Sequence, residues 1–391
     1  MDFDKLSLQK HKELIGKISI ASKTEIKTMA DLATYYTPGV AAVSKEIANK
    51  TCRVWEYTSR SNLVAVVSDG SAVLGLGNIG PEAAHPVMAG KALLFKEFAN
   101  VDAFPIVLDT QDPQEIIKTV KYLAPSFGGI NLEDISAPRC FEIENALQDL
   151  GIPVMHDDQH GTAVVVLAGL INAVKVLKKD LSKCKVVING VGAAGTAVAL
   201  MISRYTKGKV KMALIDRDGM VCTRGELDVY KQQLCGEVNH QKMHQSLDES
   251  IEGADIFIGV SVGNVLTKEM VQRMAKNPIV FAMANPTPEI DPKLAKEAGA
   301  AIIATGRSDY PNQVNNVLAF PGIFRGALDA KATKITPEML VEASYALAGC
   351  VKNPTRDKIL PSPLEKQVAK VIAKAVKQKA IEQKVTRPIC K

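Results

Sequence analysis

The segment from Lys185 to Asp216 constrains the fold more than any other part of the chain. A β-branched run, Val186 to Ile188, enters a glycine-rich turn, an alanine-rich stretch follows, and a second apolar run ends at Asp216. The turn reads Gly190, Val191, Gly192, Ala193, Ala194, Gly195. In a G-x-G-x-x-G turn between strand and helix, the first glycine allows the tight turn, the second lets the backbone approach a pyrophosphate, and the third lets helix and strand pack closely. The segment therefore predicts a Rossmann unit that binds a dinucleotide.

The same segment leaves the choice of dinucleotide open. Unpaired N–H groups at the start of the predicted helix, from Ala193 onward, would hold the phosphates. Asp216 lies 21 residues after Gly195, where an acid binds a ribose 2′-hydroxyl and favours NAD. Arg217 follows directly, and Lys211 and Arg224 are near enough in sequence to meet a 2′-phosphate. The cofactor is therefore predicted to be NAD or NADP.

The net charge of +6 does not indicate a nucleic-acid partner. Eleven basic residues against three acidic ones fall within residues 351–391, so the rest of the chain is close to neutral. Four lysines of this stretch share one face of a predicted C-terminal helix: Lys366, Lys370, Lys374 and Lys377. Such a run is more often a solvated helix face than a binding patch.

The cysteines and the absence of targeting signals predict a cytoplasmic protein. Seven cysteines, scattered and without C-x-x-C spacing, argue against a disulfide framework or a zinc site and fit a reducing compartment. The first residues include acids and no apolar core, unlike a signal peptide. By this reading, no apolar run approaches the ~20 residues that a membrane helix needs, so no membrane association is expected.

Alternating strand and helix patterns predict an α/β protein with largely parallel sheets. The first ~30 residues look helical and polar, and from Asn62 onward strands and helices alternate. The predicted elements are strands at 63–67, 104–108, 152–155, 256–260, 279–283 and 301–304, and helices at 82–98, 113–123 and 162–177 with another opened by Pro138. The length of 391 residues suits two domains. We expect an α/β substrate domain over residues 1–160, a Rossmann domain with C-terminal helices over 161–391, and an active site between them.

Four carboxylates on short predicted loops indicate a cation site. Glu133 and Asp134 form one pair, and Asp157 and Asp158 form a second pair 24 residues further on. Acids that converge repel one another unless a cation or a lysine intervenes. Oxygen ligands without cysteine point to Mg²⁺ or Mn²⁺ rather than zinc. The alternative is that these acids are helix caps or surface pairs.

Two further side chains are candidates for proton transfer. Lys91 lies within an apolar helical stretch, where it is either snorkelling or a buried base with a lowered pKa. Tyr36 stands beside a Pro-Gly turn, where its phenol points into a cleft or forms part of the core. His156 and His160 flank the second acid pair, and hydrogen bonding is the expected role of both.

Long stretches of the chain resemble the small, bacterial-type malic enzymes. They include YYTPGVA, PVMAGKALLF, GGINLEDISAPRCFEIE, HDDQHGTA, FAMANPTPE and GRSDYPNQVNNVLAFPGIF, so the resemblance covers nearly the whole chain. It implies that Tyr36 is the general acid, that Lys91 is the general base and that Asp157 orients the lysine. It also implies that the cation is held by Glu133, Asp134 and Asp158.

The resemblance extends to substrate binding and assembly. Asn285 and Asn316 match residues that contact substrate and nicotinamide, and Asn285 is thus also a cofactor-binding candidate. The family's N-terminal domain is similar to that of amino-acid dehydrogenases, and the small enzymes dimerise through it. Two positions depart from related sequences: Ala89 stands where a glutamate is common, and Ala72 where larger malic enzymes carry an arginine that binds the substrate carboxylate.

The reaction implied is oxidative decarboxylation of L-malate to pyruvate and CO₂, with reduction of NAD or NADP and a requirement for Mg²⁺ or Mn²⁺. Two alternatives are a catalytically silent regulatory protein that binds a dinucleotide, and a metal-free amino-acid dehydrogenase on the same architecture. A requirement for a divalent cation would distinguish a malic enzyme from the metal-free amino-acid dehydrogenase. Reduction of the dinucleotide by malate would exclude the regulatory protein.

Overall fold

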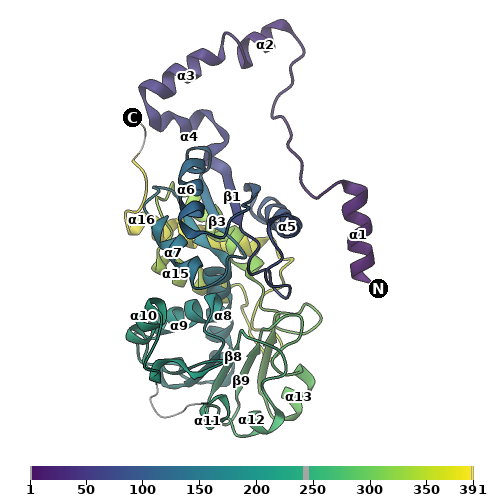
Figure 1. Cartoon of the computed structure of the whole chain (residues 1–391), viewed down its shortest axis with the longest axis vertical. Coiled ribbons are helices and arrows are strands. Elements are labelled where there is room, and N and C mark those ends of the chain that lie inside the picture. The colour runs from purple at the N-terminus through teal and green to yellow at the C-terminus, as the bar shows by residue number, and fades with distance from the viewer. Residues whose placement is uncertain (1, 241–245, 389, 391) are drawn as a thin grey trace.

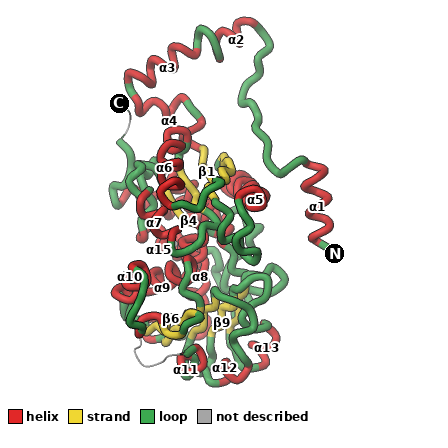
Figure 2. Tube along the Cα trace, in the orientation of Figure 1, coloured by secondary structure: helices red, strands yellow, loops and turns green. Residues whose placement is uncertain are grey.

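The chain folds into two α/β bodies and an N-terminal arm that projects from the first body (Figure 1). The computed structural model describes residues 2–240, 246–388 and 390. Helices enclose both sheets, and long connecting loops lie where the two bodies meet (Figure 2). The α/β architecture with two sheets confirms the predicted fold class.

The first sheet is parallel throughout and has the strand order β2-β1-β3-β4. Its strands are β1 (Leu63–Ser68), β2 (Asp102–Val107), β3 (Gly129–Leu132) and β4 (Val154–His156). Its helices are α5 (Pro81–Ala99), α6 (Pro113–Leu123) and α7 (Arg139–Ala146). Leu132 pairs with His156 at the ends of β3 and β4, so the residues that follow both strands emerge at the same edge of the sheet.

The second sheet has the order β10-β9-β8-β5-β6-β7 and is parallel except for β7. Its strands are β5 (Lys185–Asn189), β6 (Lys211–Asp216), β7 (Gly219–Met220), β8 (Ile256–Gly259), β9 (Ile279–Ala282) and β10 (Ile302–Thr305). Helix α9 (Ala193–Tyr205) follows β5. The central pair β5 and β8 is the point where the strand order reverses, the position at which open α/β sheets bind their ligands.

The remaining short elements connect these units. They are α4 (Val54–Tyr57), α10 (Val229–Glu237), α11 (Leu247–Ser250), α12 (Lys268–Gln272) and α13 (Pro292–Glu297), with 3₁₀ turns η1 (Thr51–Arg53), η2 (Ser59–Asn62), η3 (Ala124–Ser126), η4 (Leu181–Lys183), η5 (Val221–Thr223) and η6 (Asn316–Leu318).

Helix α8 (Asp157–Leu177) is the central helix of the molecule and packs against α9 and α15 (Pro337–Gly349). The domain boundary expected between residues 160 and 161 falls within its first turn. Of the residues that the structure describes, α8 is also the one helix long and apolar enough to cross a membrane, so the expectation that no run approaches this length was wrong. Most of its apolar stretch, 67 %, is buried inside the protein, as in a core helix.

Two C-terminal helices complete the packing around α5. Gly322 and Gly326 of α14 (Phe320–Asp329) face α16 (Gln367–Glu382) so closely that a Cβ at either position would lie within 2.8 Å of an α16 atom. Phe320 and Phe324 stack edge-on against Phe95 of α5. The C-terminal helices therefore pack against the first body although they follow the second in sequence. Lys366, Lys370, Lys374 and Lys377 are exposed, as the sequence predicted.

The arm comprises α1 (Phe3–Leu14), α2 (Met29–Tyr35) and α3 (Val40–Asn49). Residues 15–28 form no helix, so the expectation of a helical first ~30 residues holds only for α1. No residue of these three helices is buried. A capping box at Thr28 and Asp31 begins α2, so local hydrogen bonds define these helices rather than packing against the body.

The structure contradicts the prediction about the cysteines. Cys52 is disulfide-bonded to Cys390, and Cys222 to Cys235. The first bond joins residues 338 apart in sequence, a proximity that only the tertiary fold creates and that cysteine spacing does not reveal. The cytoplasmic location expected from the sequence stays a prediction.

Candidate functional site

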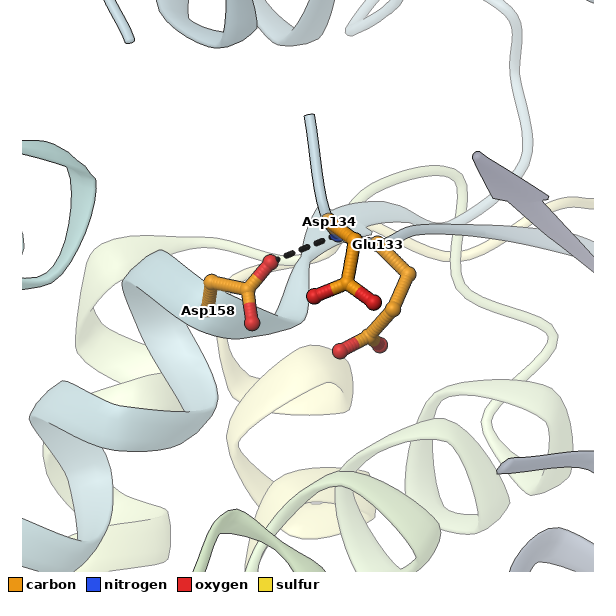
Figure 3. A group of neighbouring side chains, drawn as sticks. All are labelled: Glu133, Asp134 and Asp158. Carbon is orange, nitrogen blue, oxygen red and sulfur yellow. Dashed lines mark hydrogen bonds between the residues drawn. The ribbon is translucent and has the colours of Figure 1, made fainter. Parts of the chain in front are cut away.

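Three carboxylates meet at the carboxyl edge of the first sheet. Glu133 and Asp134 follow β3, and Asp158 lies in the first turn of α8, directly after β4. Figure 3 shows the three side chains turned toward one point. One oxygen from each lies within 4.8 Å of the others. The Asp134 N–H donates to Asp158 Oδ2 at 2.8 Å and fixes the two segments relative to each other.

The electrostatics of this cluster fit a divalent cation. Burial, together with the neighbouring acids and against the opposing charge of Lys91, raises the pKa of Glu133 to about 7 and that of Asp134 to about 9. Burial likewise raises the pKa of Asp158. Asp134 Oδ2 is buried without a hydrogen-bond partner. Three converging carboxylates with an unsatisfied oxygen provide the hard ligands that Mg²⁺ and Mn²⁺ prefer.

Lys91 connects this cluster to Asp157. It lies on α5 with its side chain 12 % exposed, and Nζ is 2.9 Å from Glu133 Oε1 and 2.6 Å from Asp157 Oδ2. The same Nζ lies 4.7 Å from the centre of the buried Phe320 ring. The lysine is therefore buried and ion-paired rather than snorkelling.

The expected lowering of the Lys91 pKa is not observed. Burial acts to lower the pKa of Lys91, but the negative charges of Asp157, Glu133 and Asp158 outweigh it and raise the pKa. The sequence placed the lysine in an apolar helix and gave no distance to the acids, so desolvation appeared to be the dominant effect. In the structure, three nearby carboxylates make the net shift of the Lys91 pKa upward instead of downward.

Asp157 is held between two donors. It accepts hydrogen bonds from Lys91 Nζ and, at 2.7 Å, from Asn316 Nδ2. Burial raises the pKa of Asp157 to about 7, and the Lys91 charge opposes the rise. A Cβ at Gly161 would collide with the Asp157 carboxylate, so the glycine one turn later makes room for it. The structure thus brings together Lys91, Asp157 and Asn316, of which the resemblance had linked only the first two.

The glycine-rich turn has the geometry of a phosphate cradle. Gly190 has φ +106°, which favours glycine, and a Cβ on it would lie 2.6 Å from the Val260 carbonyl oxygen. A Cβ on Gly195 would lie 1.8 Å from the Gly190 carbonyl oxygen, so only glycine lets α9 approach β5. Nothing lies within 4 Å of a Cβ on Gly192, which leaves space beside the backbone where α9 begins at Ala193 and Ala194. These features fit the pyrophosphate of a dinucleotide.

Asp216 ends β6, as predicted, but its carboxylate is already paired. Arg224 Nη2 lies 2.5 Å from one oxygen and Lys231 Nζ 3.0 Å from the other. The hydrogen bonds from these donors hold the pKa of Asp216 below its usual value although burial acts to raise it. Arg217, the other predicted phosphate ligand, has a 93 % exposed side chain 3.8 Å from Asp218.

Two predicted residues lie apart from the acid cluster. Tyr36 ends α2 on the arm and is 65 % exposed, and Figure 1 shows α2 well away from α5 and β3. Asn285 is exposed on the loop after β9. Its carbonyl oxygen would lie 3.3 Å from a Cβ on Gly75 of the first body, so this loop packs against the first body.

Two supporting residues escaped the sequence analysis. Asn131 is buried and donates to Glu133 at 2.9 Å, and its position two residues earlier on the same strand could have indicated this. Glu144 is buried and accepts hydrogen bonds from the His156 N–H and from the side chains of Gln159 and His160. Nothing in the sequence links Glu144 to a segment 12 to 16 residues later. The hydrogen-bonding role expected for His160 is confirmed.

Comparisons with known proteins agree with this site. The family model described as "Malic enzyme, NAD binding domain" matches residues 159–381, and that of the "Malic enzyme, N-terminal domain" matches residues 15–148. A bifunctional malic/malolactic enzyme of Bacillus subtilis is 53 % identical over 97 % of this chain and 94 % of that protein. An NADP-dependent malic enzyme of Escherichia coli is 46 % identical over 96 % of this chain and 52 % of that protein.

Solved structures show the same similarity. A malic enzyme from Pyrococcus horikoshii superimposes with a TM-score of 0.93 at 45 % identity, covering 100 % of this chain and 93 % of that one. The NAD-dependent malic enzyme of Thermotoga maritima gives 0.91 at 48 % identity, covering 95 % and 98 %. Two family models together match most of the chain, and both of its sheets have counterparts in solved relatives. The chain belongs to the malic enzyme family.

Proposed function

We propose that this chain catalyses the oxidative decarboxylation of L-malate to pyruvate and CO₂ with reduction of NAD or NADP. The observation that carries the proposal is the placement of Lys91 against both Glu133 and Asp157. A buried base thereby lies beside a set of carboxylates suited to a cation, and Asn316 connects Asp157, the partner of that base, to the second body. Membership of the family supports the same reaction.

A divalent cation and a dinucleotide would supply the chemistry that the side chains of the protein lack. Glu133, Asp134 and Asp158 would hold Mg²⁺ or Mn²⁺, which polarises the substrate hydroxyl and stabilises the enolate that decarboxylation leaves. The turn at Gly190, Gly192 and Gly195 would hold the dinucleotide, whose nicotinamide accepts the hydride.

Side chains of the protein accept the proton of the substrate hydroxyl and position the group that accepts it. Lys91 takes the proton of the malate C2 hydroxyl, for which it must be neutral when substrate binds. The carboxylates around Lys91 raise its pKa, so compensation of their charge is what makes the amine available as a base. Asp157, held by Asn316, keeps the amine aimed at one position. Cation binding and base strength are therefore coupled.

We further propose that Tyr36 is the general acid for enolpyruvate and that it acts from the partner in a homodimer. Within one chain the arm leaves the phenol exposed and remote from Lys91. The arm also exposes apolar side chains that water does not favour, among them Phe3, Leu8, Ile20 and Met29. A second copy of the chain satisfies both needs, because it buries this surface and supplies the proton donor that each site lacks. Contact through the N-terminal domain is the arrangement that the sequence predicted.

Steady-state kinetics test the reaction directly. The purified chain is assayed with L-malate, Mn²⁺ and each dinucleotide in turn, following dinucleotide reduction at 340 nm and pyruvate as product. We expect malate-dependent reduction that stops after chelation and returns with Mn²⁺. Dinucleotide binding without reduction would identify a regulatory protein, and full activity after chelation would favour a metal-free dehydrogenase.

A further inference from the structure

A buried carboxylate joins two loops at the carboxyl edge of the second sheet. Glu289 is 0 % exposed and lies on the loop that follows β9. Its Oε1 accepts a hydrogen bond at 3.0 Å from the N–H of Ser261, which follows β8. Its Oε2 accepts one at 3.0 Å from the N–H of Ala284, which follows β9. A Cβ on Gly259, the last residue of β8, would collide with the Glu289 carboxylate, so the strand end leaves room for this acid.

The side chain of Glu289 holds the two loops where they leave the sheet. Both of its donors are main-chain N–H groups, so the carboxylate fixes the course of the backbone itself. Removing it would leave the N–H groups of Ser261 and of the buried Ala284 without this acceptor, which is costly for a buried donor. Further along, main-chain hydrogen bonds join the same two loops, from Asn264 to Pro288 and from Leu266 to Glu289.

The loop after β8 lies against the glycine-rich turn. A Cβ on Gly190 would lie 2.6 Å from the Val260 carbonyl oxygen and 3.1 Å from the Cβ of Ser261. Asn189, the last residue of β5, donates from Nδ2 to Ser261 Oγ at 2.7 Å. The position of Ser261 is therefore linked to the turn that would hold the pyrophosphate of the dinucleotide.

The loop after β9 lies against the first body. Ala284 directly precedes Asn285, whose carbonyl oxygen would lie 3.3 Å from a Cβ on Gly75. Gly75 belongs to the loop between β1 and α5, the helix that carries Lys91. Glu289 thus connects a loop at the glycine-rich turn to a loop that contacts the body carrying the proposed base.

We propose that Glu289 is a positioning residue that sets the dinucleotide-binding turn in register with the site in the first body. The inference rests on the function proposed above, because it concerns the transfer of hydride to a dinucleotide held at that turn. Glu289 acts through Ser261 and Ala284 rather than on the substrate. Transfer between two bound molecules depends steeply on their separation, and a misplacement of about 1 Å can lower the rate by roughly 10²-fold.

The test compares two probes bound to the full chain in calorimetric titrations. Adenosine 5′-diphosphate ends at the pyrophosphate, whereas NADH and NADPH reach beyond it toward the first body. Glu289→Gln keeps the shape of the side chain, but its one amide oxygen accepts from one loop while its NH₂ group meets the donor of the other. We expect it to bind adenosine 5′-diphosphate within about twofold of wild type and the preferred reduced dinucleotide about fivefold more weakly, the order of one lost hydrogen bond.

Turnover provides a second measurement. In Glu289→Gln, kcat should fall by roughly 10²-fold while the malate KM changes by less than about threefold, because the first body still holds the substrate. Asp255→Asn is the matched control. Asp255 lies just before β8 at the opposite edge of the same sheet and likewise accepts a main-chain N–H, from Lys185 at 3.0 Å. Its loss should lower the Tm and leave the ratio of the two probe affinities unchanged.

The outcomes separate this inference from the proposed function. Equal losses for both probes, a wild-type ratio in Glu289→Gln, or the same change of ratio in Asp255→Asn would overturn the inference. If Glu289→Gln does not fold, the ratio is measured in Glu289→Asp, whose shorter side chain keeps two acceptor oxygens, and a wild-type ratio there overturns it as well. A wild-type chain that binds both probes without malate-dependent reduction would instead count against the proposed reaction.

Discussion

Lys91 and Tyr36 are the two proton-transfer residues of the proposed mechanism, yet their surroundings within the chain are opposite. Lys91 has a 12 % exposed side chain and two carboxylate partners, whereas Tyr36 is 65 % exposed on an arm with no buried helix residue. The pKa of Lys91 is set by buried carboxylates of its own chain, and compensation of their charge would make the amine available as a base. A phenol that delivers one proton needs only correct placement. The contrast suggests that the chain completes the basic half of its site alone and leaves the acidic half to a partner.

Removal of the base should give the largest effect. Lys91→Ala should lower kcat by roughly 10³- to 10⁴-fold, near the top of the range for a general base, because no other amine among the described residues contacts Asp157. The measurement is steady-state turnover with saturating malate and Mn²⁺. Lys96→Ala, on the exposed part of the same helix, is the control and should keep its activity. Similar losses in both variants would mean that helix damage, not loss of the base, is responsible.

Removal of the acid should cost less. Tyr36→Phe should lower kcat by roughly 10²-fold and leave the malate KM within about twofold, because the phenol acts after malate has bound. Analysis of the products of quenched reactions should then show that the conversion of enolpyruvate to pyruvate is slowed more than hydride transfer. A kcat near that of wild type at neutral pH would remove Tyr36 from the mechanism.

Mixing the two inactive proteins locates the acid. If Tyr36 acts across the interface, a hybrid of Tyr36→Phe and Lys91→Ala chains contains one intact site, and random exchange of subunits restores about a quarter of wild-type activity. Activity is measured after dissociation and reassociation of the mixture. No recovery, with hybrids verified by mass, would place both residues in the same chain and contradict the proposed dimer.

A pH effect should be confined to the body. The raised pKa values of Glu133 and Asp134, about 7 and about 9, mean that the folded chain retains protons which the unfolded chain has lost. Their contribution is full below about pH 4 and is lost as pH rises toward 9, so the Tm of chelated protein should fall across this window. Asp158→Asn should abolish turnover but reduce this fall, because it removes one repelling charge. A Tm independent of pH in chelated protein would show that the acids do not destabilise one another.

The smallest effect should come from the arm. Met29→Ser replaces an exposed apolar side chain and should weaken dimer formation by a few fold, at roughly 25 cal/mol per Å² of lost burial, without changing the Tm of the body. Sedimentation velocity at several concentrations gives the dimer affinity. Lys5→Ser on α1 is the control. A lowered Tm with unchanged dimer affinity would mean that the arm stabilises its own chain instead.

The sequence was informative where structure is local. Helix α6 has its predicted bounds, and every predicted strand lies within two residues of an observed one, because periodicity and proline positions specify them. The short strands β3 and β7 were not predicted. The sequence placed four acids on short loops, and the family resemblance assigned Glu133, Asp134 and Asp158 to the cation; the structure brings these three together. Cofactor-binding glycines were recognised because their spacing is fixed by backbone contacts within one turn and helix.

The sequence did not predict contacts between segments that lie far apart along the chain. The Cys52–Cys390 bond and the opposing effect of Glu133 on the Lys91 pKa both depend on proximity that no spacing encodes. The pairing of Asp216 with Lys231 belongs to the same class, since the lysine lies 15 residues later on a helix that folds back. The order of the strands in each sheet likewise depends on the crossover connections between them, which bring non-consecutive strands side by side.

Helix α8 gives the active site a mechanical property. Asp157 is its first residue and directly follows β4 of the first sheet, so it stays with Lys91 of α5, whereas the rest of the helix packs against α9 and α15. Asn316 of η6, which follows the second sheet in sequence, donates to the same aspartate. A hinge movement between the bodies would therefore break the bond from Asn316 to Asp157 and leave the pair of Lys91 and Asp157 intact. Closure around a substrate would restore that bond, so the aspartate is held between both donors only in the closed state.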